Sequence, residues 1–236
     1  MTQPFRNGNE SWRSVIWPEL QFFSKEDHLV MQSERAMNTV SSALWRGGTC
    51  EATHFINGSV PLDFNCDDPM EMMKEFIDGR GYPVEKSVGL LTAAKLSHAS
   101  FHAKEGDHFR MIACATAGTG NSARAGLKRE TFSAYQAGTI NVFVFIDATL
   151  TPAAMVNGIM TATEAKCAAL QDLQIVDRKG GIATGTTSDA IVLASQPHGL
   201  DQGFHAFAGT ATTIGYAIGR LVYKSVYEAV VTQNSP

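Results

Sequence analysis

The segment INVFVFID, residues 140–147, constrains the fold of this chain more than any other stretch. It is apolar throughout between Asn141 and Asp147, which is typical of a strand buried on both faces of its sheet. The helix predicted next, in TPAAMVNGIMTATEAKCAALQDL, begins with Thr151 as a candidate N-cap and Pro152 at the first helical position. Its apolar face is formed by Met155, Ile159, Ala162, Ala169 and Leu173. A central strand followed by a long amphipathic helix indicates a sheet with a helix packed on its face.

Further strands and helices are predicted on both sides of this unit. The segment SVGLLTAA and the run Ala190–Ser195 are interpreted as strands, and residues 100–117 as a hairpin. The segment DDPMEMMKEFIDGRG, with Asp68 as candidate N-cap, and residues 213–231 are interpreted as helices. This order of elements predicts an α+β fold, with a mostly antiparallel or mixed sheet and helices packed on its faces.

All 236 residues are expected to form a single domain, 1–236. A hydrophobic content of 44% is ample for the core of a chain of this length. Residues 1–40 are expected to be an irregular N-terminal segment that covers a sheet edge or forms a lid, with a short strand or two near residues 11–24. Another strand followed by a loop is expected in residues 28–44.

Charge and cysteine content exclude several classes of function. The formal net charge is −4 and the pI is near 6.0, and there is no basic cluster, so neither nucleic acid nor an anionic membrane is expected as a partner. The four cysteines are scattered without zinc-ligand spacing, so no metal site is expected. The polar N-terminus lacks an apolar signal-peptide core, and no apolar run is long enough to span a membrane. We therefore expect a cytoplasmic protein.

Four segments rich in glycine and hydroxyl residues stand at the ends of predicted strands or helices. They are ATAGTGNSARAG (115–126), AGTIN (137–141), ATGTTSD (183–189) and AGTATTIG (208–215). Turns use these residue types, so each segment alone is most simply a turn. Four of them beside apolar elements favour a second interpretation, in which they gather at one rim of a sheet and bind a polar ligand through backbone N–H groups, hydroxyls and amides.

Two aspartates adjoin the predicted buried strands. Asp147 either pins the turn at residues 149–152 or projects over a site at the end of its strand. Asp189 follows a run of hydroxyl residues, and beside Ser188 it can orient or deprotonate a nucleophile or a water molecule. We treat both aspartates as candidates for catalysis.

Other polar residues have a simple structural interpretation beside the functional one. Glu164 forms a polar helical stripe with Asn157 and Thr161, which faces either solvent or a polar cleft. Lys166 is most simply a surface charge. His54 lies beside a Gly/Asn-containing strand, where a single histidine is usually structural.

The candidate catalytic residues are thus Asp189, Ser188, Glu164 and Asp147. The candidate substrate-binding residues are Thr116, Asn121, Ser122, Arg124, Thr139, Asn141, Thr184, Thr186, Thr210 and His54.

Several of these segments, taken in order, resemble the adenosylcobinamide amidohydrolase (CbiZ) family. The resemblance runs from about Ser41 to Val231, and its most specific parts are ATAG…NSARAG, TPAAMVN…TATEAK and TGT-SDA. It implies a cytoplasmic salvage enzyme that hydrolyses the amide between the corrin ring and the aminopropanol arm of adenosylcobinamide. The cobalt corrinoid is then the substrate, and no cofactor is expected. The apolar sheet edges are compatible with a homodimer.

For such a hydrolysis, Asp189 or Glu164 is the hypothetical base, acting on water or on Ser188. The glycine-rich segments would supply N–H donors to the oxyanion, and Asn121, Arg124 and Asn141 would hold amide groups of the corrin. A weaker resemblance links the chain to the aminopeptidase and ornithine-acetyltransferase group, which implies an αββα sandwich. Two alternatives therefore stay open: a corrinoid-binding protein without turnover, and a self-processing aminopeptidase-like amidase.

Overall fold

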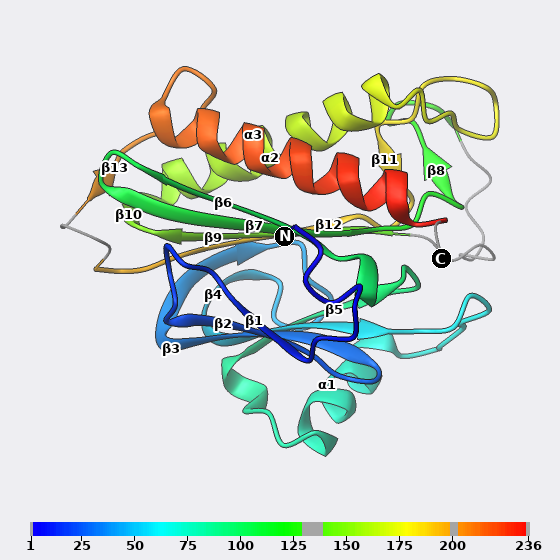
Figure 1. Cartoon of the computed structure of the whole chain (residues 1–236). Coiled ribbons are helices and arrows are strands. Elements are labelled where there is room, and N and C mark those ends of the chain that lie inside the picture. Colours follow the sequence, from blue (N-terminus) through cyan, green and yellow to red (C-terminus); the bar gives the residue numbers. More distant parts are fainter. Residues whose placement is uncertain (1, 129–138, 199–202, 235–236) are drawn as a thin grey trace.

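A computed structural model describes residues 2–128, 139–198 and 203–234. One mixed sheet of nine strands curls over itself and forms two layers (Figure 1). The lower layer contains, in spatial order, β1 (Ser11–Arg13), β2 (Leu20–Ser24), β3 (His28–Ser41), β4 (Gly48–Ser59) and β5 (Ser87–Thr92). The upper layer contains the end of β3 followed by β12 (Ala190–Ser195), β9 (Ile140–Asp147), β7 (Phe109–Ala117) and β6 (Ser100–Gly106).

Strand β3 belongs to both layers because its pairing changes along its length. Residues 29–33 pair with β2, and residues 38–41 pair with β12. A register shift in its pairing with β4, between Gln32 and Met37, separates the two halves, and bulges of this kind bend a strand. The two layers are therefore joined covalently and by hydrogen bonds along one side.

Three helices cover the outer faces of the layers. Helices α2 (Pro152–Asp172) and α3 (Thr213–Thr232) lie above the upper layer, and α1 (Pro69–Gly79) lies below the lower layer (Figure 1). Short elements complete the described part of the chain: η1 (Val84–Lys86), η2 (Leu96–His98), the paired strands β8 (Ser122–Ala123) and β11 (Gly185–Thr186), and the paired strands β10 (Thr149–Leu150) and β13 (Phe204–His205). The α+β class with a mixed sheet is confirmed, and the layers follow the order helix, sheet, sheet, helix.

Three hydrophobic clusters match the three contacts between these layers. The first lies between the two upper helices and the upper layer and includes Val142 and Val144 of β9. The second fills the space between the layers and includes Phe55, Phe143 and Phe145. The third lies between the lower layer and α1 and includes Ile56 of β4 and Ile77 of α1. Because successive side chains of β9 point to opposite faces, its odd-numbered residues lie between the layers.

Helix boundaries follow the sequence signals closely. Thr151 caps α2 by accepting a hydrogen bond from Ala154 N at 3.0 Å, and Asp68 caps α1 by accepting from Glu71 N at 3.0 Å. Among the residues described, no helix has the length and apolar character needed to cross a membrane.

The N-terminal residues differ from the expectation. Residues 1–40 were expected to be an irregular segment with a few strands, but β1, β2 and most of β3 lie there as a regular part of the lower layer and include its β1 edge. Only residues 2–5 follow the expected role of covering an edge: Thr2 O accepts from Phe101 N of β6 at 2.7 Å, and the Phe5 ring packs edge-on against Phe101. The strand expected from His28 is confirmed, and it extends through the exposed Glu34 and Arg35 as far as Ser41.

Candidate functional site

The space between the two layers changes from apolar to polar at one end. Along the inner face of β9, the order from the centre outward is Phe145, Phe143, Asn141 and then Thr139. Two other strands change in the same way: β4 of the facing layer from Phe55 to Asn57, and the neighbouring β7 from Cys114 to Thr116. A hydrophobic sandwich needs no such replacement, so this end of the layer is built for polar chemistry.

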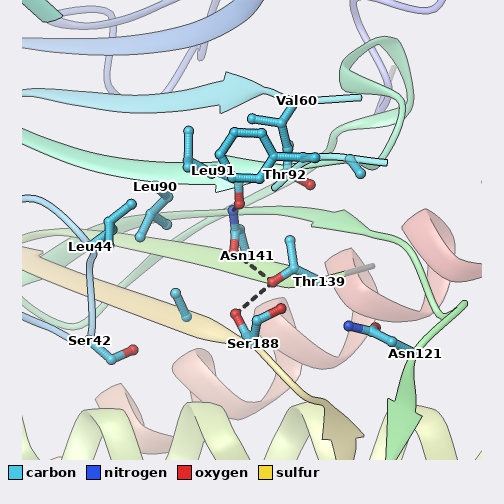
Figure 2. A pocket seen from close by; sticks show the side chains of 13 residues that line it. Ser42, Leu44, Val60, Leu90, Leu91, Thr92, Asn121, Thr139, Asn141 and Ser188 are labelled. Atoms are coloured by element: carbon cyan, nitrogen blue, oxygen red, sulfur yellow. Dashed lines mark hydrogen bonds between the residues drawn. The ribbon is translucent and has the colours of Figure 1, made fainter. Parts of the chain in front are cut away.

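A cavity of about 340 Å³ opens at this polar end (Figure 2). One wall is polar and comes from the upper layer and its loops, with Asn121, Thr139, Asn141 and Ser188. The opposite wall is mainly apolar and comes from the lower layer and the segment that follows β4; it contains Val60, Phe64, Leu90, Leu91 and Thr92. The arrangement suits a ligand with an apolar side and a few groups that form hydrogen bonds.

Three fully buried polar side chains, Asn57, Thr116 and Asn141, connect the two layers, and Asn141 lines the cavity; we call them the floor network. Asn57 Nδ2 donates to Thr116 Oγ1 at 2.9 Å, and Asn141 Nδ2 donates to Asn57 Oδ1 at 2.7 Å. Asn141 Nδ2 also donates to Leu91 O at 2.9 Å, so its two protons are both used within the protein. Asn141 therefore has a fixed orientation, with Oδ1 turned toward Thr139, whose Oγ1 lies 3.3 Å away.

Thr139 stands at the centre of the polar wall. It is 5% exposed, and its hydroxyl donates to Ser188 O at 2.7 Å, which ties the start of β9 to the loop before β12. Ser188 itself is exposed at the cavity wall. The two hydroxyl residues therefore border one cavity from two neighbouring parallel strands, whose amino ends lie at the same edge of the sheet.

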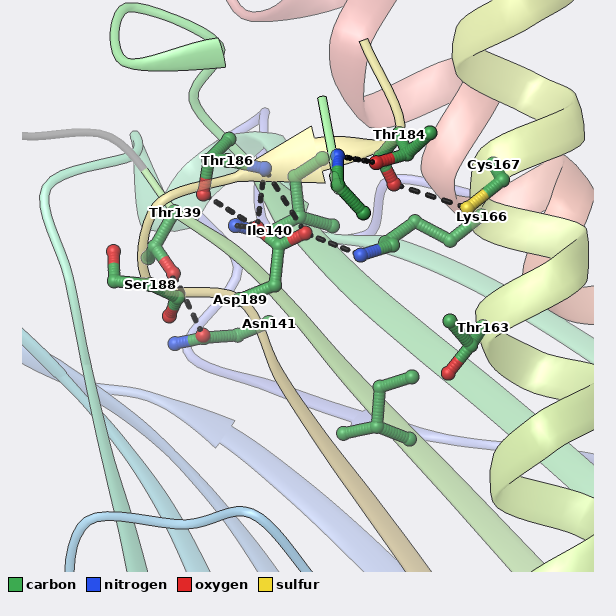
Figure 3. A network of polar contacts seen from close by, with 12 residues as sticks. Thr139, Ile140, Asn141, Thr163, Lys166, Cys167, Thr184, Thr186, Ser188 and Asp189 are labelled. Atoms are coloured by element: carbon green, nitrogen blue, oxygen red, sulfur yellow. Dashed lines mark hydrogen bonds and ion pairs between the residues drawn. The ribbon is translucent and has the colours of Figure 1, made fainter. Parts of the chain in front are cut away.

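Asp189 lies behind this wall, and its carboxylate forms hydrogen bonds and an ion pair with other residues of the protein (Figure 3). Oδ1 accepts from Ile140 N at 3.1 Å and from Thr186 Oγ1 at 2.5 Å, and both oxygens lie 3.1 Å from Thr186 N. Oδ2 also forms an ion pair with Lys166 Nζ. With donors on both oxygens, this carboxylate holds two backbone segments in place and is not among the residues that line the cavity.

The loops beside the cavity contain most of the other predicted binding residues. Asn121 Nδ2 donates to Thr187 Oγ1 at 2.6 Å, and Ser122 belongs to β8, which pairs with Thr186 of β11. Thr184 Oγ1 accepts from Ala125 N at 2.9 Å. Arg124 is exposed and donates to Ile182 O at 2.7 Å. The segments 115–126, 139–141 and 183–189 are therefore brought together, as predicted; residues 137 and 138 of the second segment lie outside the described residues.

The fourth segment and Asp147 lie elsewhere, contrary to the hypothesis of a single rim. Asp147 is the last residue of β9, roughly 23 Å along the strand from Ile140. It is buried and forms an ion pair with Arg110, whose Nε donates to Oδ2 at 2.8 Å. A separate polar cavity of about 250 Å³ surrounds this pair. Since β9 and β12 are parallel, the end of one and the start of the other cannot share an edge.

Thr210 is also remote from the cavity. It precedes α3, whose opposite end reaches the cavity side, where Gln233 Oε1 accepts from Thr119 N at 3.0 Å. A helix of 20 residues spans about 30 Å, so this length separates Thr210 from the loop that contains Asn121.

Two further candidates have other surroundings. Glu164 is exposed on the outer side of α2, so its stripe faces solvent at that position. His54 lies on the face of β4 that is turned away from the inter-layer space, with Nδ1 2.9 Å from Thr53 Oγ1 and its ring beside Tyr82, and burial lowers its pKa. Neither residue contributes to the cavity.

The sequence interpretation missed two residues of this site. Lys166 was expected at the surface, but its side chain is 8% exposed and paired with Asp189. Its spacing of four and three residues from the buried Ala162 and Ala169 could have placed it on the inner face of the helix. Asn57 was also missed; its signal was a polar residue on the same strand face as Phe55.

Within the described ranges, no group of three or more His, Cys, Asp or Glu side chains is placed to hold a metal ion.

Comparison with known proteins identifies the family. The family model described as adenosylcobinamide amidohydrolase, CbiZ, matches residues 16–236. The chain belongs to the CbiZ family. An adenosylcobinamide amidohydrolase from Methanosarcina mazei is 31% identical over 214 residues, covering 88% of this chain and 96% of the relative. Another from Halobacterium salinarum is 30% identical over 192 residues, covering 77% and 75%.

The matches of this CbiZ-family chain to solved structures are more distant. A β-aminopeptidase from Burkholderia sp. is 11% identical with a TM-score of 0.44, and the match covers 87% of this chain and 77% of the aminopeptidase.

Proposed function

We propose that this CbiZ-family protein hydrolyses the amide bond between the corrin ring and the aminopropanol arm of adenosylcobinamide. The products are adenosylcobyric acid and aminopropanol, and the cobalt belongs to the substrate. The observation that carries the proposal is the cavity with one polar and one apolar wall, in a chain whose family is named for this reaction.

The size of the cavity suggests which part of the substrate enters it. At about 340 Å³ it is near the lower limit of ligand pockets, which hold roughly 300–1,000 Å³. A corrin ring is too large for this space, whereas one amide arm with its aminopropanol group fits. In our proposal the arm enters between the layers and the ring stays outside the mouth.

Thr139 is the residue that we place at the scissile carbonyl, because two hydrogen-bond networks meet there. The floor network reaches it through Asn141, and the Asp189 network holds the backbone N–H of the next residue, Ile140. In direct attack, Thr139 Oγ1 bonds to the carbonyl carbon, the C–N bond breaks and the hydroxyl proton passes to the nitrogen of the departing aminopropanol; water then hydrolyses the ester and restores the hydroxyl. In the alternative, the hydroxyl orients a water molecule that attacks the carbonyl and gives a proton to the same nitrogen. The Asn121 side chain and the Ser188 hydroxyl bind the carbonyl and the leaving amine. Asn141 and Asp189 hold this arrangement and do not react.

The test is release of aminopropanol from adenosylcobinamide, measured by mass spectrometry with purified protein. Thr139→Val keeps the volume and removes the hydroxyl, and we expect it to lower kcat by about 100-fold or more, as loss of one critical polar group does. Thr210→Val is the matched control, because it makes the same change on an exposed residue at the far end of α3. Equal activity of the two variants would exclude Thr139 from the reaction.

The same preparation separates the alternatives. Stoichiometric corrinoid binding without aminopropanol release would indicate a binding protein. A chain of 25.5 kDa that stays intact on purification argues against self-processing. A mass increase equal to an adenosylcobyric acyl group during turnover would distinguish direct attack by Thr139 from attack by water.

A further inference from the structure

The ion pair between Lys166 and Asp189 is buried, with side chains 8% and 11% exposed. Lys166 comes from the middle of α2 and Asp189 from the residue before β12, so the pair crosses the space between the helix and the sheet edge (Figure 3). Burial of an ammonium group is unfavourable unless a partner compensates its charge. Within the described part of the chain, the carboxylate of Asp189 is the hydrogen-bond partner found for Lys166.

The other contacts of Asp189 lead directly to the polar wall of the cavity. It accepts from the backbone N–H of Ile140, which follows Thr139, and from that of Thr186, which begins the segment ending at Ser188. The carboxylate of Asp189 therefore holds both backbone segments that contain the residues of the polar wall. The hydrogen bond from Thr139 Oγ1 to Ser188 O links these two segments directly.

The backbone of Gly185 lies close against the pair. A Cβ atom on Gly185 would meet both Asp189 Oδ2 and Lys166 Nζ. Gly185 also belongs to β11, which pairs with β8 next to Asn121. The pair and three wall segments thus form one closely packed unit.

We propose that Lys166 is a positioning residue, which acts through Asp189 to hold Thr139 and Ser188 in register for the reaction without touching the substrate. Lys166 is not among the residues that line the cavity. The inference rests on the proposed function for its turnover measurement. Loss of the ammonium should leave substrate binding nearly intact, because the lining side chains remain, while the reacting groups lose their alignment.

The test compares Lys166→Met with Arg110→Met. Each variant removes a cation that is paired with an aspartate at one end of β9. Asp189, the partner of Lys166, bonds to Ile140 N at the cavity end, whereas Arg110, whose side chain is 19% exposed, pairs with Asp147 at the opposite end. We expect Lys166→Met to lower kcat at least tenfold with KM within threefold, and Arg110→Met to keep kcat within threefold at a temperature where both are folded. Amide hydrogen exchange of Ile140 and Thr186 should accelerate in Lys166→Met and remain unchanged in Arg110→Met.

A double variant covers the case in which Lys166→Met does not fold. Lys166→Met combined with Asp189→Leu removes both charges, so that no uncompensated charge stays buried, which is the main cost of breaking such a pair. We expect it to fold and still to lose kcat at least tenfold, because Ile140 N and Thr186 N lose their acceptor. Full kcat in this variant, equal losses in Lys166→Met and Arg110→Met, or unchanged exchange at both amides would overturn the proposal. If the unaltered protein releases no aminopropanol, the proposed function fails, and the exchange rates still decide the positioning role.

Discussion

Replacing Asn57 by leucine tests whether the floor network holds the two layers together at the cavity. Asn57 is 0% exposed and contributes to two hydrogen bonds, with Thr116 Oγ1 at 2.9 Å and Asn141 Nδ2 at 2.7 Å. Leucine has nearly the same size, so the cavity contribution is small, and both partner groups are left buried without this contact. At roughly 1–3 kcal/mol for each unsatisfied buried group, the free energy of unfolding should fall by about 2–6 kcal/mol.

Urea denaturation followed by tryptophan fluorescence measures this change. Ser195→Ala is the matched control, because Ser195 is also fully buried but its hydroxyl has no hydrogen-bond partner among the described residues. The control should change the free energy of unfolding by less than about 0.5 kcal/mol, or stabilise the protein. We also expect Asn57→Leu to lower kcat, since Asn141 loses its fixed orientation beside Thr139.

A double variant makes the reasoning refutable. Thr116→Val removes the other partner of one bond, so Asn57→Leu and Thr116→Val together should cost less than the sum of the single changes. A loss below about 1 kcal/mol for Asn57→Leu, or additive losses in the double variant, would show that the floor network does not stabilise this end of the sandwich.

Three further outcomes are expected. The hydrogen bond from Arg80 holds the pKa of Asp27 at about 2, below its usual 3.8. This carboxylate therefore stabilises the fold above pH 4, and the contribution disappears as the pH falls toward 2. Arg80→Gln should reduce that part of the acid dependence of the midpoint of urea denaturation. Gly185→Ala should destabilise the protein and lower kcat, because the new methyl group meets the buried ion pair. Gly209 has open space around its Cβ position, so Gly209→Ala should leave stability and kcat unchanged. A fully active, stable Gly185→Ala variant would contradict the packing described. Burial raises the pKa of the Cys114 thiol, so maleimide should modify it in urea and not in the native protein, as mass spectrometry of peptides can verify.

Local signals in the sequence were sufficient for the elements that build the site. The apolar run of β9 and the Thr151–Pro152 start of α2 were found at their observed positions, because a buried strand and a helix cap depend on neighbouring residues. The three loops at the cavity were also recognised from their glycine and hydroxyl content. These loops lie together because β9 and β12 are parallel neighbours.

The sequence did not indicate that β9 and β12 are parallel neighbours, and for this reason the predicted positions of Asp147 and Asp189 were wrong. A strand does not carry the direction of its neighbour in its own residues, so Asp147 and Asp189 were placed at one edge although they lie at opposite ends. Lys166 was misassigned for a related reason. Lysine is rarely buried without a partner, and its partner Asp189 is 23 residues later, beyond the reach of any helical spacing rule.

The parallel pairing of β9 and β12 has a practical consequence for work with this protein. The described parts of the loops at the Asp147 end, including the loop that contains the exposed Thr210, are separated from the cavity by the length of the central strands or of α3. A cysteine introduced at Thr210 should therefore accept a fluorophore or a tether to a solid support while the mouth of the cavity stays accessible to large ligands from solution.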